Sequence, residues 1–159
     1  MAIIAEDGTG KTNSNSYVSE AELTTYASDR GVTITGTNAV LLIQAMDYVE
    51  QQNFKGTKNT DAQALQWPRY NVYIDTYYIE SDSIPQLLKE AQMELALSID
   101  GGLNPLTNEG RATKREKVDV IEVEYMDGAR NVDYPTAFWN KIAKLLANGG
   151  GVSAVVMRA

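Results

Sequence analysis

Residues 83–102 read SIPQLLKEAQMELALSIDGG and combine a start signal, an apolar face and a stop signal for one helix. Ser83 and Gln86 fit a capping box with Pro85 in the first turn, and the paired glycines at 101–102 predict the end of the helix. The apolar side chains between these signals recur at helical spacing and predict one buried face. They are Leu88, Ala91, Leu95 and Ile99.

Three more helices are predicted by the same combination of a start signal and an apolar face. Ser19 and Glu22 fit a capping box, and Gly31 predicts that this helix ends just before it. The other two are predicted from helical spacing and from glycines or turn residues at their ends. The three helices should run over about 19–30, from Thr37 or Asn38 to about Gln52, and from Asp133 to about Asn148.

Two further stretches are predicted to be extended. Residues 70–78 are rich in β-forming side chains but include two poor ones, so we expect a loop with strand character. Residues 117–125 alternate apolar and acidic side chains and predict a strand, with a bulge or a bend at Val120-Ile121 where the alternation slips. Asp127-Gly128 is favourable for a tight turn, so a β-hairpin should occupy about 113–132.

The composition is that of one globular domain, with 159 residues of which 43% are hydrophobic and 22% charged. We expect a mainly α fold at 1–148, with four helices, the small hairpin and an extended N-terminal arm, followed by a glycine-hinged C-terminal tail at 149–159. The longest apolar runs are shorter than the ~20 residues of a membrane helix. Glu6 and Asp7 argue against a signal peptide, so we expect no membrane partner.

Few catalytic chemistries are open to this chain, because it contains neither cysteine nor histidine. That excludes thiol nucleophiles, imidazole bases and nearly every zinc or iron site. Glu122 and Glu124 share one face of the predicted strand and could act as paired carboxylates. The same alternation is typical of a half-exposed strand without any activity. We therefore expect no enzyme, no cofactor and no bound metal.

Residues 5–12, AEDGTGKT, fit the relaxed pattern of a phosphate-binding loop. Such a loop needs a buried strand before it and a helix after it, so that backbone N–H groups cradle the phosphate. Here residues 13–16 have turn composition, and Glu6 and Asp7 would face the phosphates. A glycine-rich surface loop is the better interpretation.

The charge balance opposes binding to phosphates. The chain has 14 basic and 21 acidic residues, a net charge of −7, which is opposite to that of a typical nucleic-acid-binding protein. One local basic cluster exists and runs directly into acidic residues, which is more typical of a solvated strand or loop. It remains the candidate nucleic-acid site, and its members are Arg111, Lys114, Arg115 and Lys117.

The aromatic residues at 67–78 offer a second candidate for nucleic-acid binding, because stacked aromatic rings can hold unpaired bases. A stacking surface needs basic residues beside it, and Arg69 is the one basic residue between Lys58 and Lys89. We therefore expect these rings to pack in a core or a subunit interface, where Trp, Tyr and Arg are favoured. Trp67 and Arg69 are the interface candidates.

The C-terminal tail is a short apolar, β-prone segment behind three glycines. Such a segment cannot bury itself, so it should pack against its own domain or add to a neighbouring subunit or partner. Its candidate interface residues are Val152, Val155, Val156, Met157 and Arg158.

Several motifs together resemble a protein family that is found in tailed bacteriophages and is known as "putative DnaT-like single-stranded DNA-binding protein". They are the opening MAII with EDGTG and NSYVS, LQWPR at 65–69, Ile84-Pro85 leading into AQMELA at 91–96, and KREKV at 114–118. Members of this family lie among phage head and neck proteins, and the architecture resembles the helical head-to-tail adaptor.

The resemblance implies a structural subunit of the phage neck, located in the virion and in the host cytoplasm during assembly. Its expected partners are the portal protein, other copies of itself in a dodecameric ring, and downstream neck or tail proteins. Genomic double-stranded DNA would pass through without specific binding, and the surplus of carboxylates favours such a channel. The alternative is a phage single-stranded DNA-binding accessory protein that uses Arg69 and the basic cluster.

Overall fold

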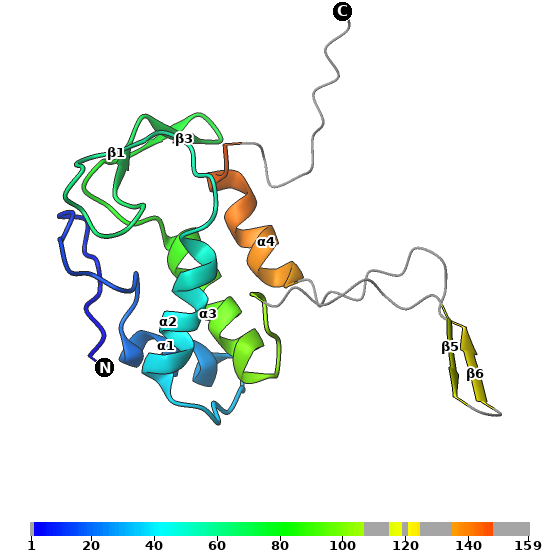
Figure 1. Cartoon of the computed structure of the whole chain (residues 1–159). Coiled ribbons are helices and arrows are strands. Elements are labelled where there is room, and N and C mark those ends of the chain that lie inside the picture. Colours follow the sequence, from blue (N-terminus) through cyan, green and yellow to red (C-terminus); the bar gives the residue numbers. More distant parts are fainter. Residues whose placement is uncertain (1, 107–114, 119–120, 125–134, 148–159) are drawn as a thin grey trace, which may run out of the picture.

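A computed structural model describes residues 2–106, 115–118, 121–124 and 135–147, with the two short middle ranges described by their backbone alone. Within these residues the chain forms four α-helices, one 3₁₀-helix and six short strands (Figure 1). The helices are α1 (Glu20–Asp29), α2 (Asn38–Val49), α3 (Gln86–Asp100), α4 (Thr136–Ile142) and η1 (Ala143–Leu145). The strands are β1 (Thr57–Lys58), β2 (Arg69–Tyr70), β3 (Val72–Ile74), β4 (Tyr77–Ile79), β5 (Arg115–Val118) and β6 (Ile121–Glu124).

The chain has a mixed α/β fold, so the expectation of a mainly α, four-helix domain is wrong. Its strands pair in three separate two-stranded antiparallel sheets, β1 with β2, β3 with β4, and β5 with β6. Each strand has only two to four residues. Strands of that length are too short for a clear alternating pattern, which is why the sequence pattern underestimates them.

The helices form one packed layer around α3. Helix α3 packs against both α2 and α4, and α1 lies across one end (Figure 1). The predicted apolar face of α3 is largely confirmed, since Leu88, Ala91 and Leu95 are fully buried and Ile99 is partly buried. Strands β1 to β4 lie at the opposite end of this layer from α1. No helix among the described residues is both long and apolar enough to cross a membrane.

The two predicted capping boxes have different outcomes. The first is confirmed, because the Glu22 backbone N–H donates to the Ser19 hydroxyl at 3.2 Å and the Ser19 N–H donates to the Glu22 carboxylate at 2.7 Å. The second is wrong, because α3 begins only at Gln86 and its N-cap, Pro85, has an extended ψ of 136°. The Ser83 hydroxyl donates instead to the Glu80 carbonyl at 2.8 Å.

The ends of the other helices also differ from the prediction. Helix α2 ends at Val49, with Glu50 as its C-cap, rather than near Gln52. Helix α4 gives way to the 3₁₀-helix η1 and does not continue to Asn148. Its predicted start at Asp133 lies outside the described residues.

The stretch at 70–78 forms more regular structure than the sequence predicts. Its two poor β-formers mark the places where the chain turns: Asn71, with φ 59°, separates β2 from β3, and Asp75, with φ 49°, lies in the turn between β3 and β4. Thr76 follows with φ 73°. Two successive positive φ values are typical of the type I′ turn that closes a tight hairpin.

The predicted strand at 117–125 is two strands. β5 and β6 pair antiparallel with Val118 opposite Ile121, so the chain reverses direction between the two strands, where the sequence pattern predicts a bulge or a bend. Ile121, the second residue of the slip in alternation, is the first residue of β6, so the slip coincides with the start of a new strand. The predicted turn at Asp127-Gly128 lies outside the described residues.

A buried polar network connects the end of α2 to the loop before β2. The Tyr17 hydroxyl donates to one Glu50 carboxylate oxygen at 2.5 Å, and the Gln66 N–H donates to the other at 2.8 Å. The Trp67 N–H donates to the Tyr17 hydroxyl at 3.2 Å. Burial raises the pKa of Glu50 above its ordinary value, although the hydrogen bonds from Tyr17 and Gln66 to its carboxylate oppose the shift.

The raised pKa of Glu50 predicts a pH dependence of stability. The folded chain holds the Glu50 proton more tightly than the unfolded chain, so the contribution of Glu50 to stability falls as pH rises above 4.5, its ordinary pKa. Urea denaturation of wild type and Glu50→Gln from pH 4.5 to 7 measures this contribution. The contributions of the other titrating groups cancel in the difference between the two free energies of unfolding. The wild-type advantage over Glu50→Gln should shrink with rising pH, and a widening advantage would contradict the prediction.

Candidate nucleic-acid interface

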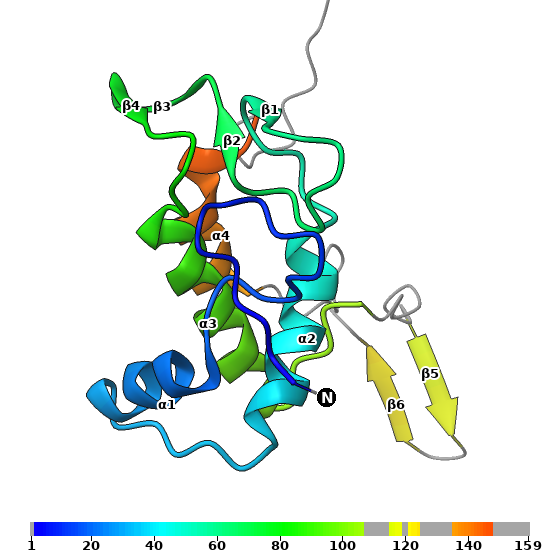
Figure 2. The same ribbon diagram turned by 90° about the vertical axis from the view of Figure 1, so that its left-hand side faces the viewer.

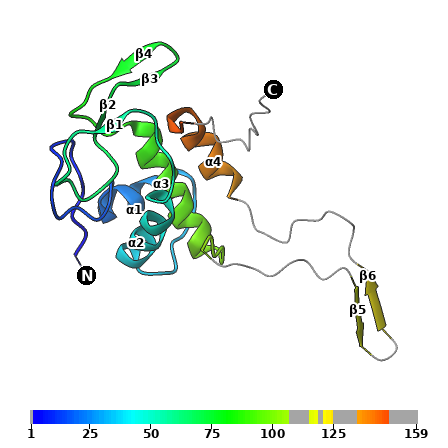
Figure 3. The same ribbon diagram turned by 45° about the horizontal axis from the view of Figure 1, so that its top comes forward.

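Four exposed tyrosines gather on the short strands. Tyr70 is 40% exposed, Tyr73 55%, Tyr77 77% and Tyr78 43%. All four lie on β2, β3 and β4, and the segment from Tyr70 to Ile79 is named the tyrosine hairpin here. It lies at the end of the protein that is remote from α1, and η1 packs on β3 (Figures 2 and 3). Of the two expectations for these rings, packing in a core is wrong for these four tyrosines. Packing in a subunit interface stays a prediction.

The hairpin register places two of these rings together. Tyr73 on β3 is directly opposite Tyr78 on β4, so both lie on the same face of the ribbon. Their ring centroids are 5.4 Å apart with the planes inclined by 58°. The other face carries Val72, which is fully buried, and Ile79, which packs against the core. The hairpin is therefore anchored by one face and presents an aromatic pair on the other.

Arg69 holds the base of the hairpin. Its guanidinium donates to the carbonyls of Lys55 at 2.7 Å, Gly56 at 2.8 Å and Gln66 at 3.2 Å, to the Phe54 carbonyl at 3.4 Å, and to the Gln66 side-chain oxygen at 2.8 Å. Arg69 is only 8% exposed, and burial lowers the pKa of its guanidinium. The Arg69 guanidinium is thus hydrogen-bonded to backbone carbonyls inside the protein and is not exposed on the surface.

Trp67, the other interface candidate of that motif, is fully buried. Its ring packs edge-to-face against Phe54, with centroids 6.1 Å apart. In the described part of the chain, Trp67 is therefore a core residue. Trp67 and Arg69 of the Trp-Pro-Arg motif are thus buried at the base of the tyrosine hairpin. The exposed aromatic rings are those of the tyrosines that come after this motif in the sequence.

Two lysines lie beside the hairpin. The chain after η1 pairs with the loop before β1, since the Lys55 N–H donates to the Leu145 carbonyl at 2.9 Å and the Ala147 N–H donates to the Asn53 carbonyl at 2.9 Å. This pairing brings Lys144 to the hairpin turn, where its ammonium lies 2.5 Å from the Asp75 carboxylate. The Lys55 ammonium donates to the Lys144 carbonyl at 2.8 Å.

The basic cluster predicted from the sequence is only partly described. Arg111 and Lys114 lie outside the described residues, as do the tail candidates Val152, Val155, Val156, Met157 and Arg158. Arg115 and Lys117 lie on β5, where the register places them opposite Glu124 and Glu122. Each basic residue of β5 thus has an acidic residue as its cross-strand partner, and with Glu116 the acidic residues of the two strands outnumber the basic ones by three to two.

In the N-terminal segment that resembles a phosphate-binding loop, the Glu6 carboxylate accepts the hydrogen bonds that a phosphate would accept. Glu6 is only 2% exposed and accepts hydrogen bonds from the N–H groups of Gly8 at 3.0 Å, Gly10 at 2.8 Å and Lys11 at 2.8 Å, and from the Ser14 hydroxyl at 2.9 Å. These are the kind of donors that would cradle a phosphate in a nucleotide-binding loop. The Glu6 carboxylate occupies their place, so this loop offers no nucleotide site.

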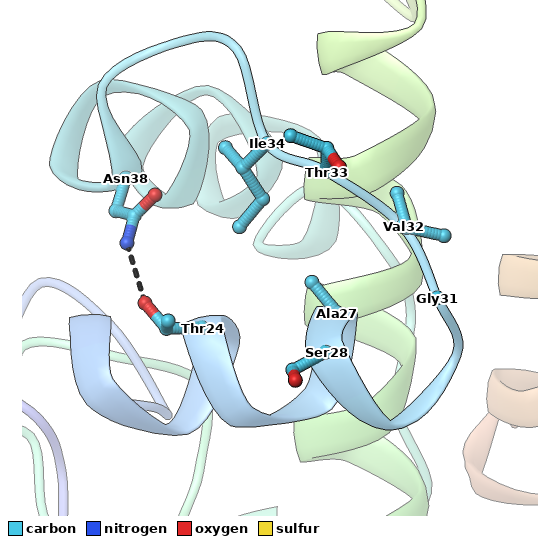
Figure 4. A pocket seen from close by; sticks show the side chains of 8 residues that line it. All are labelled: Thr24, Ala27, Ser28, Gly31, Val32, Thr33, Ile34 and Asn38. Atoms are coloured by element: carbon cyan, nitrogen blue, oxygen red, sulfur yellow. Dashed lines mark hydrogen bonds between the residues drawn. The ribbon is translucent and has the colours of Figure 1, made fainter.

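A hollow of about 510 Å³ lies between α1 and the segment that leads to α2 (Figure 4). Val32 and Ile34 line it, and the Asn38 side chain donates to the Thr24 hydroxyl at 2.8 Å across its rim. All the side chains that line it are uncharged. It therefore lacks the cations that a phosphate group would need.

Comparison with known proteins identifies one family. A sequence profile described as "Putative DnaT-like ssDNA binding protein" matches residues 1–159. No curated protein and no solved structure matches the chain. The profile points to single-stranded DNA binding, so the interpretation as a phage head-to-tail adaptor that docks under a portal is wrong.

Proposed function

The chain belongs to the family described as "Putative DnaT-like ssDNA binding protein", and from that membership we propose that it binds single-stranded DNA through the tyrosine hairpin. The exposed pair Tyr73 and Tyr78 carries this proposal. Their rings lie 5.4 Å apart on the solvent-facing side of a hairpin whose other side is anchored in the core.

Stacking is the interaction that this surface can supply. A base stacked on an aromatic side chain contributes ~1 to 3 kcal/mol, and any base can stack because each has a flat π-face. The bases of a duplex are paired and already stacked on one another, so they are not accessible to the tyrosine rings. The hairpin should therefore select single strands over duplexes, with little preference among sequences.

The number of cations that contact DNA phosphates determines how this binding should respond to salt. A protein that neutralises Z phosphates of a single strand shows a slope of log K against log salt of about −0.7Z. With one or two lysines at the hairpin, we expect a slope of about −0.7 to −1.4. Binding dominated by stacking thus depends only weakly on salt, whereas a basic groove would give a much steeper slope.

Removing the rings tests the proposal. We expect Tyr73→Leu and Tyr78→Leu each to weaken binding of a labelled oligothymidylate by about 5- to 150-fold, the loss of one stacked base. Fluorescence anisotropy at low salt measures the dissociation constant. The matched controls are Tyr73→Phe and Tyr78→Phe, which keep the ring and should bind within about threefold of wild type.

Two results would contradict the proposal. The first is wild-type affinity in a Tyr73→Leu/Tyr78→Leu double variant whose thermal unfolding shows that it is folded. The second is an absence of binding by the wild-type protein at low salt. Both side chains are exposed at the surface and not part of the buried core, so these substitutions should leave the fold intact.

A further inference from the structure

The turn of the tyrosine hairpin carries an ion pair between Asp75 and Lys144, one of the two lysines beside the hairpin. Asp75 occupies the first turn position, and its carboxylate lies 2.5 Å from the ammonium group of Lys144. The two residues are 69 positions apart in sequence and meet because η1 packs on β3. Their side chains are 64% and 57% exposed, so a ligand on the hairpin can reach the pair.

Other cations around the hairpin have protein partners that hold them in place. The Arg69 guanidinium is buried against backbone carbonyls, and the Lys58 ammonium donates to the Gln63 carbonyl at 3.3 Å. Lys144 differs because its partner is an exposed carboxylate. An exposed ion pair of this kind contributes little to stability, so a phosphate group can replace the carboxylate at small cost.

We propose that Lys144 contacts the phosphate backbone of bound single-stranded DNA, and that Asp75 is a built-in competitor that holds this lysine when DNA is absent. This inference rests on the proposed function of the hairpin. Binding then includes an exchange in which the Lys144 ammonium leaves the Asp75 carboxylate for a phosphate oxygen. The competing carboxylate keeps the affinity for DNA below the level that stacking and Lys144 would reach together.

A set of four variants tests the exchange: Asp75→Asn, Lys144→Gln, their combination, and Glu22→Gln as a control. Asparagine adopts positive φ readily, so Asp75→Asn should keep the turn. Glu22 forms a similar surface ion pair with Lys89 at 3.3 Å, and it lies on α1 at the opposite end of the molecule (Figure 1). Glu22→Gln therefore changes the net charge equally and releases a lysine far from the hairpin.

We expect Asp75→Asn to tighten binding of the labelled oligothymidylate about two- to fivefold, and Lys144→Gln to weaken it. In the Lys144→Gln background, Asp75→Asn should give little or no gain, because there is no lysine left to release. Glu22→Gln should bind within error of wild type. Anisotropy titrations at one fixed low salt concentration, with thermal unfolding to verify folding, measure all five proteins.

Each other outcome overturns the inference in a recognisable way. Equal gains from Asp75→Asn with and without Lys144 would mean that Asp75 acts only by repelling DNA. A gain from Glu22→Gln as large as that from Asp75→Asn would mean that net charge alone matters. Either result leaves the proposed function standing if the leucine variants of Tyr73 and Tyr78 still lose affinity. No binding by the wild type would remove both proposals.

Discussion

Glu6→Ala is expected to lower the free energy of unfolding by about 3 to 5 kcal/mol, a large effect for one side chain near the N-terminus. The Glu6 carboxylate accepts four hydrogen bonds, three from backbone N–H groups and one from the Ser14 hydroxyl. Alanine leaves all four donors without their acceptor, and hydrogen bonds to a charged group contribute more than neutral ones. Urea denaturation of wild type and variant measures the difference.

The same variant should be rescued by a small anion. Removing the carboxylate leaves a cradle of N–H groups with the size and polarity that a formate or phosphate ion fits. We therefore expect formate to raise the unfolding temperature of Glu6→Ala more than that of wild type. Exposed Glu20 at the start of α1 provides a control, because Glu20→Ala should change stability by less than about 1 kcal/mol and show no specific rescue. A Glu6→Ala protein as stable as Glu20→Ala would contradict the account.

Part of the fold could be predicted from the sequence because local signals suffice for it. The capping box at Ser19 acts within four residues, and the apolar spacing of 88–99 directly reflects one buried face of α3. The hairpin turn at Asp75-Thr76 needs two successive positive φ values, and a threonine there is not a usual turn signal. That turn could therefore be found only from the paired strands on either side.

The candidate site was harder to predict because it depends on contacts between distant segments. A search of the sequence near the tyrosines finds Arg69 as the nearest basic residue, but Arg69 is turned inward. The exposed cation at the hairpin, Lys144, comes from a 3₁₀-helix near the other end of the described chain. Similarly, Glu6 looks like a carboxylate that would repel phosphate, and only the folded loop shows that it replaces one.

Arg69→Lys is expected to lower the free energy of unfolding by about 2 to 4 kcal/mol, even though it keeps the positive charge. The planar guanidinium donates to five acceptors at once. A lysine ammonium group has only three N–H donors, all on one nitrogen atom. At least two carbonyls at the base of the hairpin would lose their partner. Denaturation by urea gives the loss, and a change below about 1 kcal/mol would contradict it.

The two basic residues at the hairpin should then respond oppositely to substitution. Arg69→Lys should unfold more easily, yet its folded fraction should bind single-stranded DNA like wild type, because Arg69 is buried away from the rings. Lys144→Gln should be as stable as wild type, because its ion pair is exposed, but should bind DNA more weakly. Measuring both properties on both variants separates the residue that builds the hairpin from the residue that meets the phosphate. A stable Arg69→Lys that has lost DNA binding would place Arg69 on the DNA surface and contradict this division.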